Sequence, residues 1–264
     1  MEGPVELTFE GRIAVLTLAR PAALNAFDTG LIRAFRLALR EAEGAGARAL
    51  LLTGTGRAFC AGADLMDPLL TDYGDDKSAG SLRVMREWIE PLVLDLAALP
   101  LPTVAAVNGL AAGGGIGLAL AADIVVAARS ALFLNVFVPR LGLVPDMGVT
   151  WHLARALGPA RARAIAMLGE PIAAAEAAAC GLIWKAVDDV ALMPEALAVA
   201  QRLAEGPPLA LARIRKLVDE ALNGGLEQQV RRESETQALL NATDDAGEGL
   251  AAFRQKRPPV FGGS

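Results

Sequence analysis

The fold is decided by a stretch at residues 103–128, which reads TVAAVNGLAAGGGIGLALAADIVVAA. It opens with an apolar run at 103–107 and closes with another at 124–127, and both runs are typical of buried strands. Between them stand the glycines Gly109, Gly113, Gly114, Gly115 and Gly117. So many glycines argue against a membrane-spanning helix and favour a turn buried inside the protein.

The alternation of strand and helix extends toward the N-terminus. Residues 12–18 and 49–53 are apolar runs, and between them lies a helical pattern with Asp28 at its expected N-cap. One face of that helix is expected to hold Leu31, Ile32, Phe35, Ala38 and Leu39. Another helix is expected over 81–99, with a kink at Pro91. Strands that alternate with helices predict a parallel sheet with covering helices, so the fold class is α/β.

Helices dominate the sequence beyond Met147. Alanine-rich helical patterns cover 149–157, 160–168, 173–179, 193–204 and 209–222, and only 182–187 has the pattern of a strand. We expect an α/β core at residues 1–206 and a helical region at 207–264 that begins at Pro207 and Pro208. The apolar face of that region is larger than a lone appendage needs, so it is expected to mediate oligomerisation.

Composition and charge limit the kinds of molecule that the protein is expected to bind. The 264 residues are 53% apolar and carry a formal net charge of −5, which gives no global electrostatic case for nucleic acid or an anionic membrane. Two cysteines, Cys60 and Cys180, cannot form a disulfide framework, and His152 is the single histidine, which makes a metal site improbable. A cytoplasmic protein with a small-molecule partner is expected.

Two glycine-rich stretches, at 53–65 and 108–119, follow predicted strands. Neither matches a dinucleotide or P-loop signature, and the chain has no GxSxG elbow of a serine hydrolase. Three consecutive glycines at a helix start can bring backbone N–H groups against a developing oxyanion. A second N–H from the turn at 61–63 would complete a two-donor hole. Close helix packing is the alternative, and glycine content alone favours it.

Ordered motifs along nearly the whole chain resemble the crotonase family, also called the enoyl-CoA hydratase/isomerase superfamily. They are RPAALNAF at 20–27, LLTGTGRAFCAGADL at 51–65, PTVAAVNG at 102–109 with the glycines that follow, LGLVP at 141–145 and EGLAAFRQKR at 248–257. The resemblance implies a spiral of ββα units that binds an acyl-CoA thioester, with coenzyme A as part of the substrate and no other cofactor. It also implies a homo-oligomer, either a trimer or a hexamer.

The resemblance also implies roles for particular residues. The backbone N–H groups of Ala63 and Gly114 would hold the thioester oxygen as an oxyanion hole. Substrate contacts are expected at Ala61, Asp64, Leu65, Gly113 and Phe137, and from Phe253 and Lys256 across a subunit boundary. Arg20, Arg57 and Lys256 are the basic residues available for the phosphates of coenzyme A.

The chain departs from the hydratases of this family where they carry two glutamates. The first position is Gly117 here, and the second falls within 136–138, where no carboxylate occurs. Asp146 stands nearby, in LGLVPDMGVTW at 141–151. That string, together with GLIWKAVDD at 181–189, resembles the branch of ring-1,2-epoxyphenylacetyl-CoA isomerases, in which the aspartate after the proline is the acid/base. Apolar neighbours are expected to raise the pKa of Asp146 by desolvation.

Several alternatives remain open from the sequence. Asp146 also fits an N-cap, and Glu87 or Glu90 could supply the base instead. Cys60 and His152 are expected to be structural. The favoured function is an acyl-CoA isomerase that uses Asp146, Ala63 and Gly114, acting on 3-enoyl-CoA or on ring-1,2-epoxyphenylacetyl-CoA. The alternatives are an enoyl-CoA hydratase and a non-catalytic acyl-CoA-binding protein.

Overall fold

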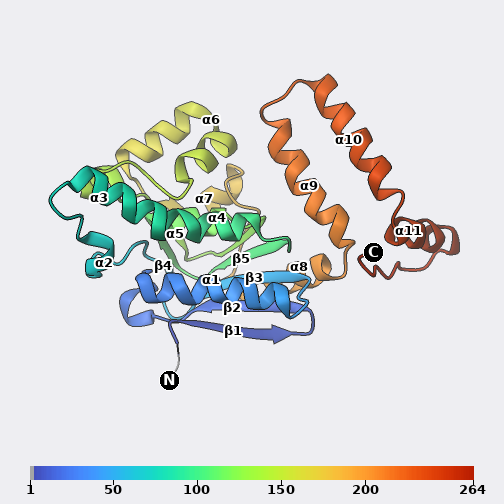
Figure 1. Cartoon of the computed structure of the whole chain (residues 1–264), viewed down its shortest axis with the longest axis horizontal. Helices are drawn as coiled ribbons and strands as arrows, with labels where there is room; N and C mark the ends of the chain where they lie inside the picture. Colours follow the sequence, from blue (N-terminus) through green and yellow to red (C-terminus); the bar gives the residue numbers. More distant parts are fainter. Residues whose placement is uncertain (1–2) are drawn as a thin grey trace.

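The computed structural model describes residues 3–264, whose strands form two sheets (Figure 1). The six-stranded sheet has the order β1 (Val5–Glu10), β2 (Ile13–Leu18), β3 (Ala49–Gly54), β5 (Thr103–Val107), β7 (Ile124–Ala128) and β10 (Lys185–Val187). The smaller sheet has the order β4 (Ala58–Cys60), β6 (Leu110–Ala112), β8 (Leu132–Leu134) and β9 (Ile172–Ala173). Only the pairs β1–β2 and β8–β9 are antiparallel among these described strands.

From β3 to β8, consecutive strands alternate between the two sheets, which produces a spiral. Each of the pairs β3–β4, β5–β6 and β7–β8 places its first strand in the large sheet and its second in the small one, and a helix follows. The predicted α/β class and the spiral of ββα units are confirmed.

The helices of the core follow the expected pattern with local corrections. They are α1 (Thr29–Gly44), α2 (Pro68–Thr71), α3 (Lys77–Val84), α4 (Glu90–Ala98), α5 (Gly114–Leu120), α6 (Val149–Leu168), α7 (Ala174–Ala179) and α8 (Leu192–Ala204), with short 3-10 turns at Pro21–Ala23 and Asp189–Ala191. The Asp28 side chain caps α1 as predicted, because it accepts a 2.7 Å bond from the amide of Leu31. The two helical patterns at 149–157 and 160–168 are joined in α6, which is interrupted at Gly158.

Two predicted elements differ in extent. The helix expected over 81–99 begins earlier, at Lys77, because the Asp76 carboxylate caps it, and a π-helical turn (Met85–Ile89) precedes Pro91. The strand expected over 182–187 is shorter. The amides of Leu182 and Ile183 both bond the carbonyl of Ala177 and close the end of α7, so only 185–187 pair with β7.

The core lies on both faces of the large sheet. Helix α8 packs on β3 and β5, and α1 packs on the opposite side against β1 and β2, where Leu31, Ile32 and Phe35 are fully buried. A strand covered on both faces is buried along its whole length, as β5 is. The small sheet lies beside this core, and its strands β4 and β6 lead into the turns that form the candidate site.

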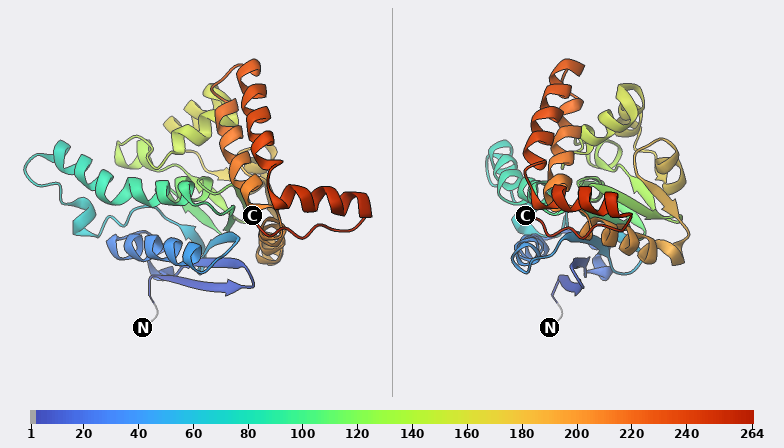
Figure 2. Two further views of the ribbon diagram at one scale, coloured as in Figure 1. Left: turned by 45° about the vertical axis from the view of Figure 1, so that its right-hand side comes forward. Right: turned by 90° about the vertical axis from the view of Figure 1, so that its right-hand side faces the viewer.

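Three helices follow the core: α9 (Pro208–Ala221), α10 (Leu226–Leu240) and α11 (Asp244–Gln255). Figure 2 shows α9 and α10 as a hairpin beside the core, with α11 projecting from it. Arg215 joins α9 to the core through Asp123 and the carbonyls of Leu99 and Leu101. The division into 1–206 and 207–264 stays a prediction, and residues 1 and 2 of that core lie outside the described residues.

None of the helices in the described residues, 3–264, combines the length with the apolar character that crossing a bilayer requires.

Candidate active site

Ala63 lies on a loop that pairs with the segment before α1. The amide of Phe27 donates a 2.9 Å bond to the carbonyl of Gly62, and the carbonyl of Phe27 accepts a 3.0 Å bond from the amide of Asp64. The N–H of Ala63 shares a trans peptide with the carbonyl of Gly62, and the two groups of a trans peptide point in opposite directions, so this N–H is turned away from Phe27. It donates no hydrogen bond to any residue in 3–264.

Gly114 stands at the start of α5, directly after β6 and Gly113. The first amides of a helix have no acceptor within it, and that of Gly114 finds none elsewhere among the described residues. Gly62 touches this helix start, since a β-carbon at Gly62 would lie 3.1 Å from the amide nitrogen of Gly114. Gly62 also has φ 91°, which favours glycine. The two expected donors therefore lie on loops in direct contact, as a two-donor hole requires.

Asp146 is largely buried in the turn that precedes α6. Its Oδ1 is inaccessible and has no hydrogen-bond partner in the described part of the chain. Burial raises the pKa of its carboxyl group to about 6, although its own backbone amide opposes the rise. Gly148 holds the N-cap position of α6, and no side chain caps the helix. The alternative that Asp146 is an N-cap is therefore wrong.

Met147 fastens this turn to α5. It is buried and has φ 48°, a left-handed conformation that non-glycine residues adopt infrequently. A β-carbon at Gly117 would lie 2.6 Å from Cβ of Met147 and closer still to its carbonyl oxygen, and one at Gly114 would lie 2.6 Å from its Sδ. The space that a side chain at 117 would fill is thus occupied by the backbone that carries Asp146.

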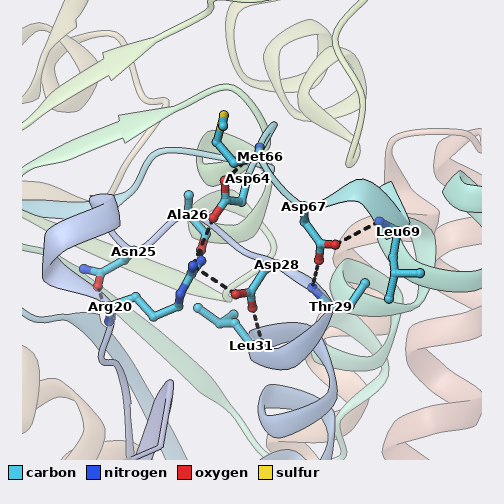
Figure 3. A network of polar contacts seen from close by, with 10 residues as sticks. All are labelled: Arg20, Asn25, Ala26, Asp28, Thr29, Leu31, Asp64, Met66, Asp67 and Leu69. Atoms are coloured by element: carbon cyan, nitrogen blue, oxygen red, sulfur yellow. Dashed lines mark hydrogen bonds and ion pairs between the residues drawn. The ribbon is translucent and has the colours of Figure 1, made fainter. Parts of the chain in front are cut away.

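A polar network centred on Arg20 supports the loop that carries Ala63 (Figure 3). The guanidinium of Arg20 lies 2.9 Å from Oδ2 of Asp28 and 3.0 Å from Oδ2 of Asp64, and it also donates to the carbonyl of Ala26. Oδ1 of Asp64 accepts from the amide of Met66 at 3.0 Å. Both oxygens of Asp64 are therefore engaged, and the Arg20 guanidinium is committed to carboxylates rather than to a phosphate.

The expected substrate contacts lie at different distances from these loops. A β-carbon at Gly113 would lie 3.8 Å from the buried ring of Phe137 and 3.9 Å from the carbonyl of Ala61, so these three residues meet. Phe137 begins a π-helical turn, η3 (Phe137–Leu141). Leu65 follows Asp64 on the same loop and is 58% exposed.

Two expected contacts lie far from these loops within one chain. Phe253, on α11, is 81% exposed, and Lys256 follows at the end of that helix, on the side of the molecule away from α5 (Figures 1 and 2). Their predicted role therefore requires a second copy of the chain.

The competing residues are poorly suited to proton transfer at this site. Glu87 and Glu90 are exposed. Cys60 is buried and its pKa is raised to about 12 by that burial, so its thiol stays protonated. Burial lowers the pKa of His152 to about 4, and its ring packs edge-on against Trp151 as a neutral group.

Sequence reasoning missed Met147 and the ring of Phe27, which would lie 2.8 Å from a β-carbon at Gly114. It also missed the pairing of Arg20 with Asp64. The only signal for Met147 was its place between Asp146 and Gly148 in a turn after a proline.

Comparison with known proteins agrees with the fold. The family described as Enoyl-CoA hydratase/isomerase matches residues 8–264. A probable enoyl-CoA hydratase of Rhodobacter capsulatus is 45% identical over 251 residues, which is 95% of each chain. The 1,2-epoxyphenylacetyl-CoA isomerase of Escherichia coli is 42% identical over 255 residues, 96% of each chain. The crystal structure of a putative enoyl-CoA hydratase/isomerase from Mycobacterium abscessus superposes with a TM-score of 0.90 at 34% identity, covering 98% of this chain and 100% of the other.

Proposed function

Because this chain belongs to the enoyl-CoA hydratase/isomerase family, we propose that it is an acyl-CoA isomerase with Asp146 as its acid/base. It would shift the double bond of a 3-enoyl-CoA to the 2-position, or rearrange a ring-1,2-epoxyphenylacetyl-CoA. The observation that carries the proposal is the buried, unbonded Oδ1 of Asp146 on a turn packed against the α5 glycines.

In this mechanism the thioester oxygen accepts hydrogen bonds from the amides of Ala63 and Gly114. Asp146 removes a proton from C2 of a 3-enoyl-CoA, and the electrons move onto the thioester oxygen as an enolate. The same carboxyl group returns the proton at C4, which leaves the double bond between C2 and C3. Each amide donor contributes about 3 kcal/mol of transition-state stabilisation. No cofactor beyond the coenzyme A of the substrate takes part.

The raised pKa of Asp146 suits both steps. A carboxylate with a pKa of about 6 is mostly ionised at neutral pH and is a stronger base than an ordinary aspartate. After it takes the proton it is also a competent acid, so one residue can serve in both directions.

Water addition is the first alternative, and the Rhodobacter capsulatus relative is described as a probable hydratase. In the hydratases that the sequence resembles, two carboxylates position and activate water. Here residue 117 is a glycine whose side-chain space is filled by Met147, and 136–138 contain no acidic residue. These features favour isomerisation.

A non-catalytic acyl-CoA-binding protein is the second alternative. Such a protein would have no use for a carboxylate whose burial is unfavourable and whose oxygen lacks a partner. Asp146 therefore favours an enzyme.

We also propose that the protein is a cytoplasmic homo-oligomer, either a trimer or a hexamer. The structure describes α9 and α10 in full, and neither helix has a buried residue. Ile214, Val218, Leu226 and Val230 are about half exposed or more. A subunit packed on this surface would cover it and could bring Phe253 and Lys256 to a neighbouring acyl-CoA.

The experiment offers the purified protein a 3-enoyl-CoA, a 2-enoyl-CoA and the aryl epoxide thioester in separate reactions. Conversion of the first or third without formation of a 3-hydroxyacyl-CoA is expected. Efficient hydration of the 2-enoyl-CoA would favour the hydratase alternative. Binding of all three without turnover would favour the non-catalytic one.

A further inference from the structure

Arg20, one of the basic residues available for the phosphates of coenzyme A, has its guanidinium between two carboxylates instead. Its guanidinium joins two carboxylates from different segments, Asp28 before α1 and Asp64 directly after Ala63. The side chains of Arg20 and Asp64 are only 23% and 16% exposed. An arginine fork held by two partly buried carboxylates and a carbonyl has a defined geometry, unlike an ordinary surface ion pair.

The segment that carries Arg20 is itself anchored. The amide of Arg20 donates to Oδ1 of Asn25 at 2.9 Å, and the buried Asn25 side chain donates to the carbonyls of Thr55 and Ala58. This ties Arg20 to the turn before β4 and to the first residue of β4, the strand that leads into the loop of Ala63.

The loop of Ala63 rests on the same segment through its backbone. Ala61 donates to the carbonyl of Leu24, and Phe27 bonds the peptides on both sides of Ala63. Arg20 adds the side-chain bond to Asp64, one residue beyond the donor amide. Rotation of the Gly62–Ala63 peptide, which contains the Ala63 N–H, would displace Asp64 and strain this bond, so Arg20 restricts the direction of that N–H.

Charge gives the same pair a second effect. A carboxylate next to an oxyanion donor would oppose the negative charge that develops on a thioester oxygen. The cation of Arg20 lies between Asp64 and Asp28 and offsets part of their combined negative charge.

We propose that Arg20 is a positioning residue for the oxyanion hole, acting through Asp64 on the amide of Ala63. This inference rests on the proposed function, in which that amide holds the thioester oxygen. It applies equally to isomerisation and to water addition, because both need the same polarised thioester.

The test compares Arg20→Lys, Arg20→Gln, Asp64→Asn and the double variant Arg20→Gln/Asp64→Asn with the parent protein. Arg36→Gln is the matched control, since Arg36 of α1 forms a partly exposed ion pair with Asp95 of α4 and bonds neither Asp64 nor the loop of Ala63. The probe is an aryl-enoyl-CoA, whose ultraviolet absorption moves to longer wavelength when hydrogen bonds polarise its thioester. Binding of the probe, kcat and KM are measured beside this shift.

Arg20→Gln is expected to lower kcat about 10- to 100-fold and to reduce the absorption shift, with little change in KM, because the hole acts mainly on the transition state. Arg20→Lys keeps the charge but loses the fork, and an intermediate loss is expected. The double variant is expected to lose no more than Arg20→Gln, since the two residues act as one unit. Arg36→Gln is expected to match the parent.

Folded Arg20 variants with the parent absorption shift would overturn the proposal, whatever their kcat. Weaker probe binding with an unchanged shift would assign Arg20 to coenzyme A instead. If Arg20→Gln fails to fold, Arg20→Lys and Asp64→Asn decide by the same readout. A parent protein that shifts the probe but turns over no acyl-CoA would contradict the proposed function alone, and one that gives no shift would contradict both.

Discussion

Asp146 carries an energetic cost in its ionised form. Its pKa is raised from 3.8 to about 6, so the folded state binds its proton more tightly than the unfolded chain does. The favourable contribution of this group to folding is fully present below pH ~4 and is lost as the pH rises through about 6. At neutral pH the protein keeps a destabilising charge in place, which is typical of a residue retained for chemistry.

Asp146→Asn separates chemistry from stability. Activity on a 3-enoyl-CoA is expected to fall about 100-fold or more, because the amide cannot take a proton. The free energy of unfolding at neutral pH is expected to rise by about 1 to 2 kcal/mol, and the gain should vanish near pH 4. Denaturant unfolding at both pH values checks this. Retained activity with a lower melting temperature would show that Asp146 is structural.

The parent protein is also expected to lose kcat as the pH falls through about 6, when Asp146 becomes protonated. Glu87→Gln and Glu90→Gln remove the exposed competitors and should leave this acidic limb where it is. If the acidic limb moved in either variant, the base would be the glutamate changed in that variant, Glu87 or Glu90.

Gly117 is expected to tolerate no side chain. Gly117→Ala would place a β-carbon against Met147 and push the turn of Asp146 away from α5. A displacement of that kind is expected to lower kcat about 10- to 100-fold. Gly44→Ala is the control, since a β-carbon there meets nothing within 4 Å. Equal kcat values for the two variants would contradict the tight packing of Met147.

The turns that follow two short strands position the two proposed oxyanion donors. Strands β4 and β6 end next to each other in the small sheet, so the turns that follow them carry Ala63 and Gly114 to one place. The helix start at Gly114 adds the positive end of a short dipole.

Gly114→Val tests this arrangement. Its side chain would collide with Sδ of Met147 and Cζ of Phe27, at 2.6 and 2.8 Å from the β-carbon alone. Loss of catalysis and weaker binding of an acyl-CoA are expected together, and calorimetric titration measures the second. A variant that still turned over substrate would remove Gly114 from the mechanism.

The long elements could be predicted from the sequence because each has its own period and cap, as α1 has in Asp28 and its apolar face. The assignment of strands to two sheets could not, since β4, β6 and β8 are three residues long and too short for a period to show. Asp146 was found through its motif. The Arg20–Asp64 pair joins residues 44 positions apart, a separation that carries no local signal.

The C-terminal helices α9 and α10 form an exposed apolar surface on one side of the molecule. Arg215 and Arg48 fasten them to the core, the latter through the carbonyls of Gly206 and Phe261. Their outer apolar side chains remain uncovered in a single chain, which is the basis for the proposed oligomer.

Truncation after Gly206 is expected to abolish both assembly and activity. Light scattering and the isomerase assay measure the two losses on the same preparation. Phe253→Ala is the control, since it keeps the helices and should raise KM for acyl-CoA while the assembly persists. A fully active monomer would contradict the proposed oligomer and would mean that the apolar face of these helices packs within its own chain.

The contact between Met147 and Gly117 makes the two positions epistatic. A glutamate introduced at 117 alone would meet the backbone of Met147, in the turn before α6, before it could reach a substrate. A variant with two carboxylates at this site would therefore need a different conformation of residues 146–148. That change would displace Asp146. Isomerisation and water addition are thus separated here by at least two linked changes, each harmful without the other.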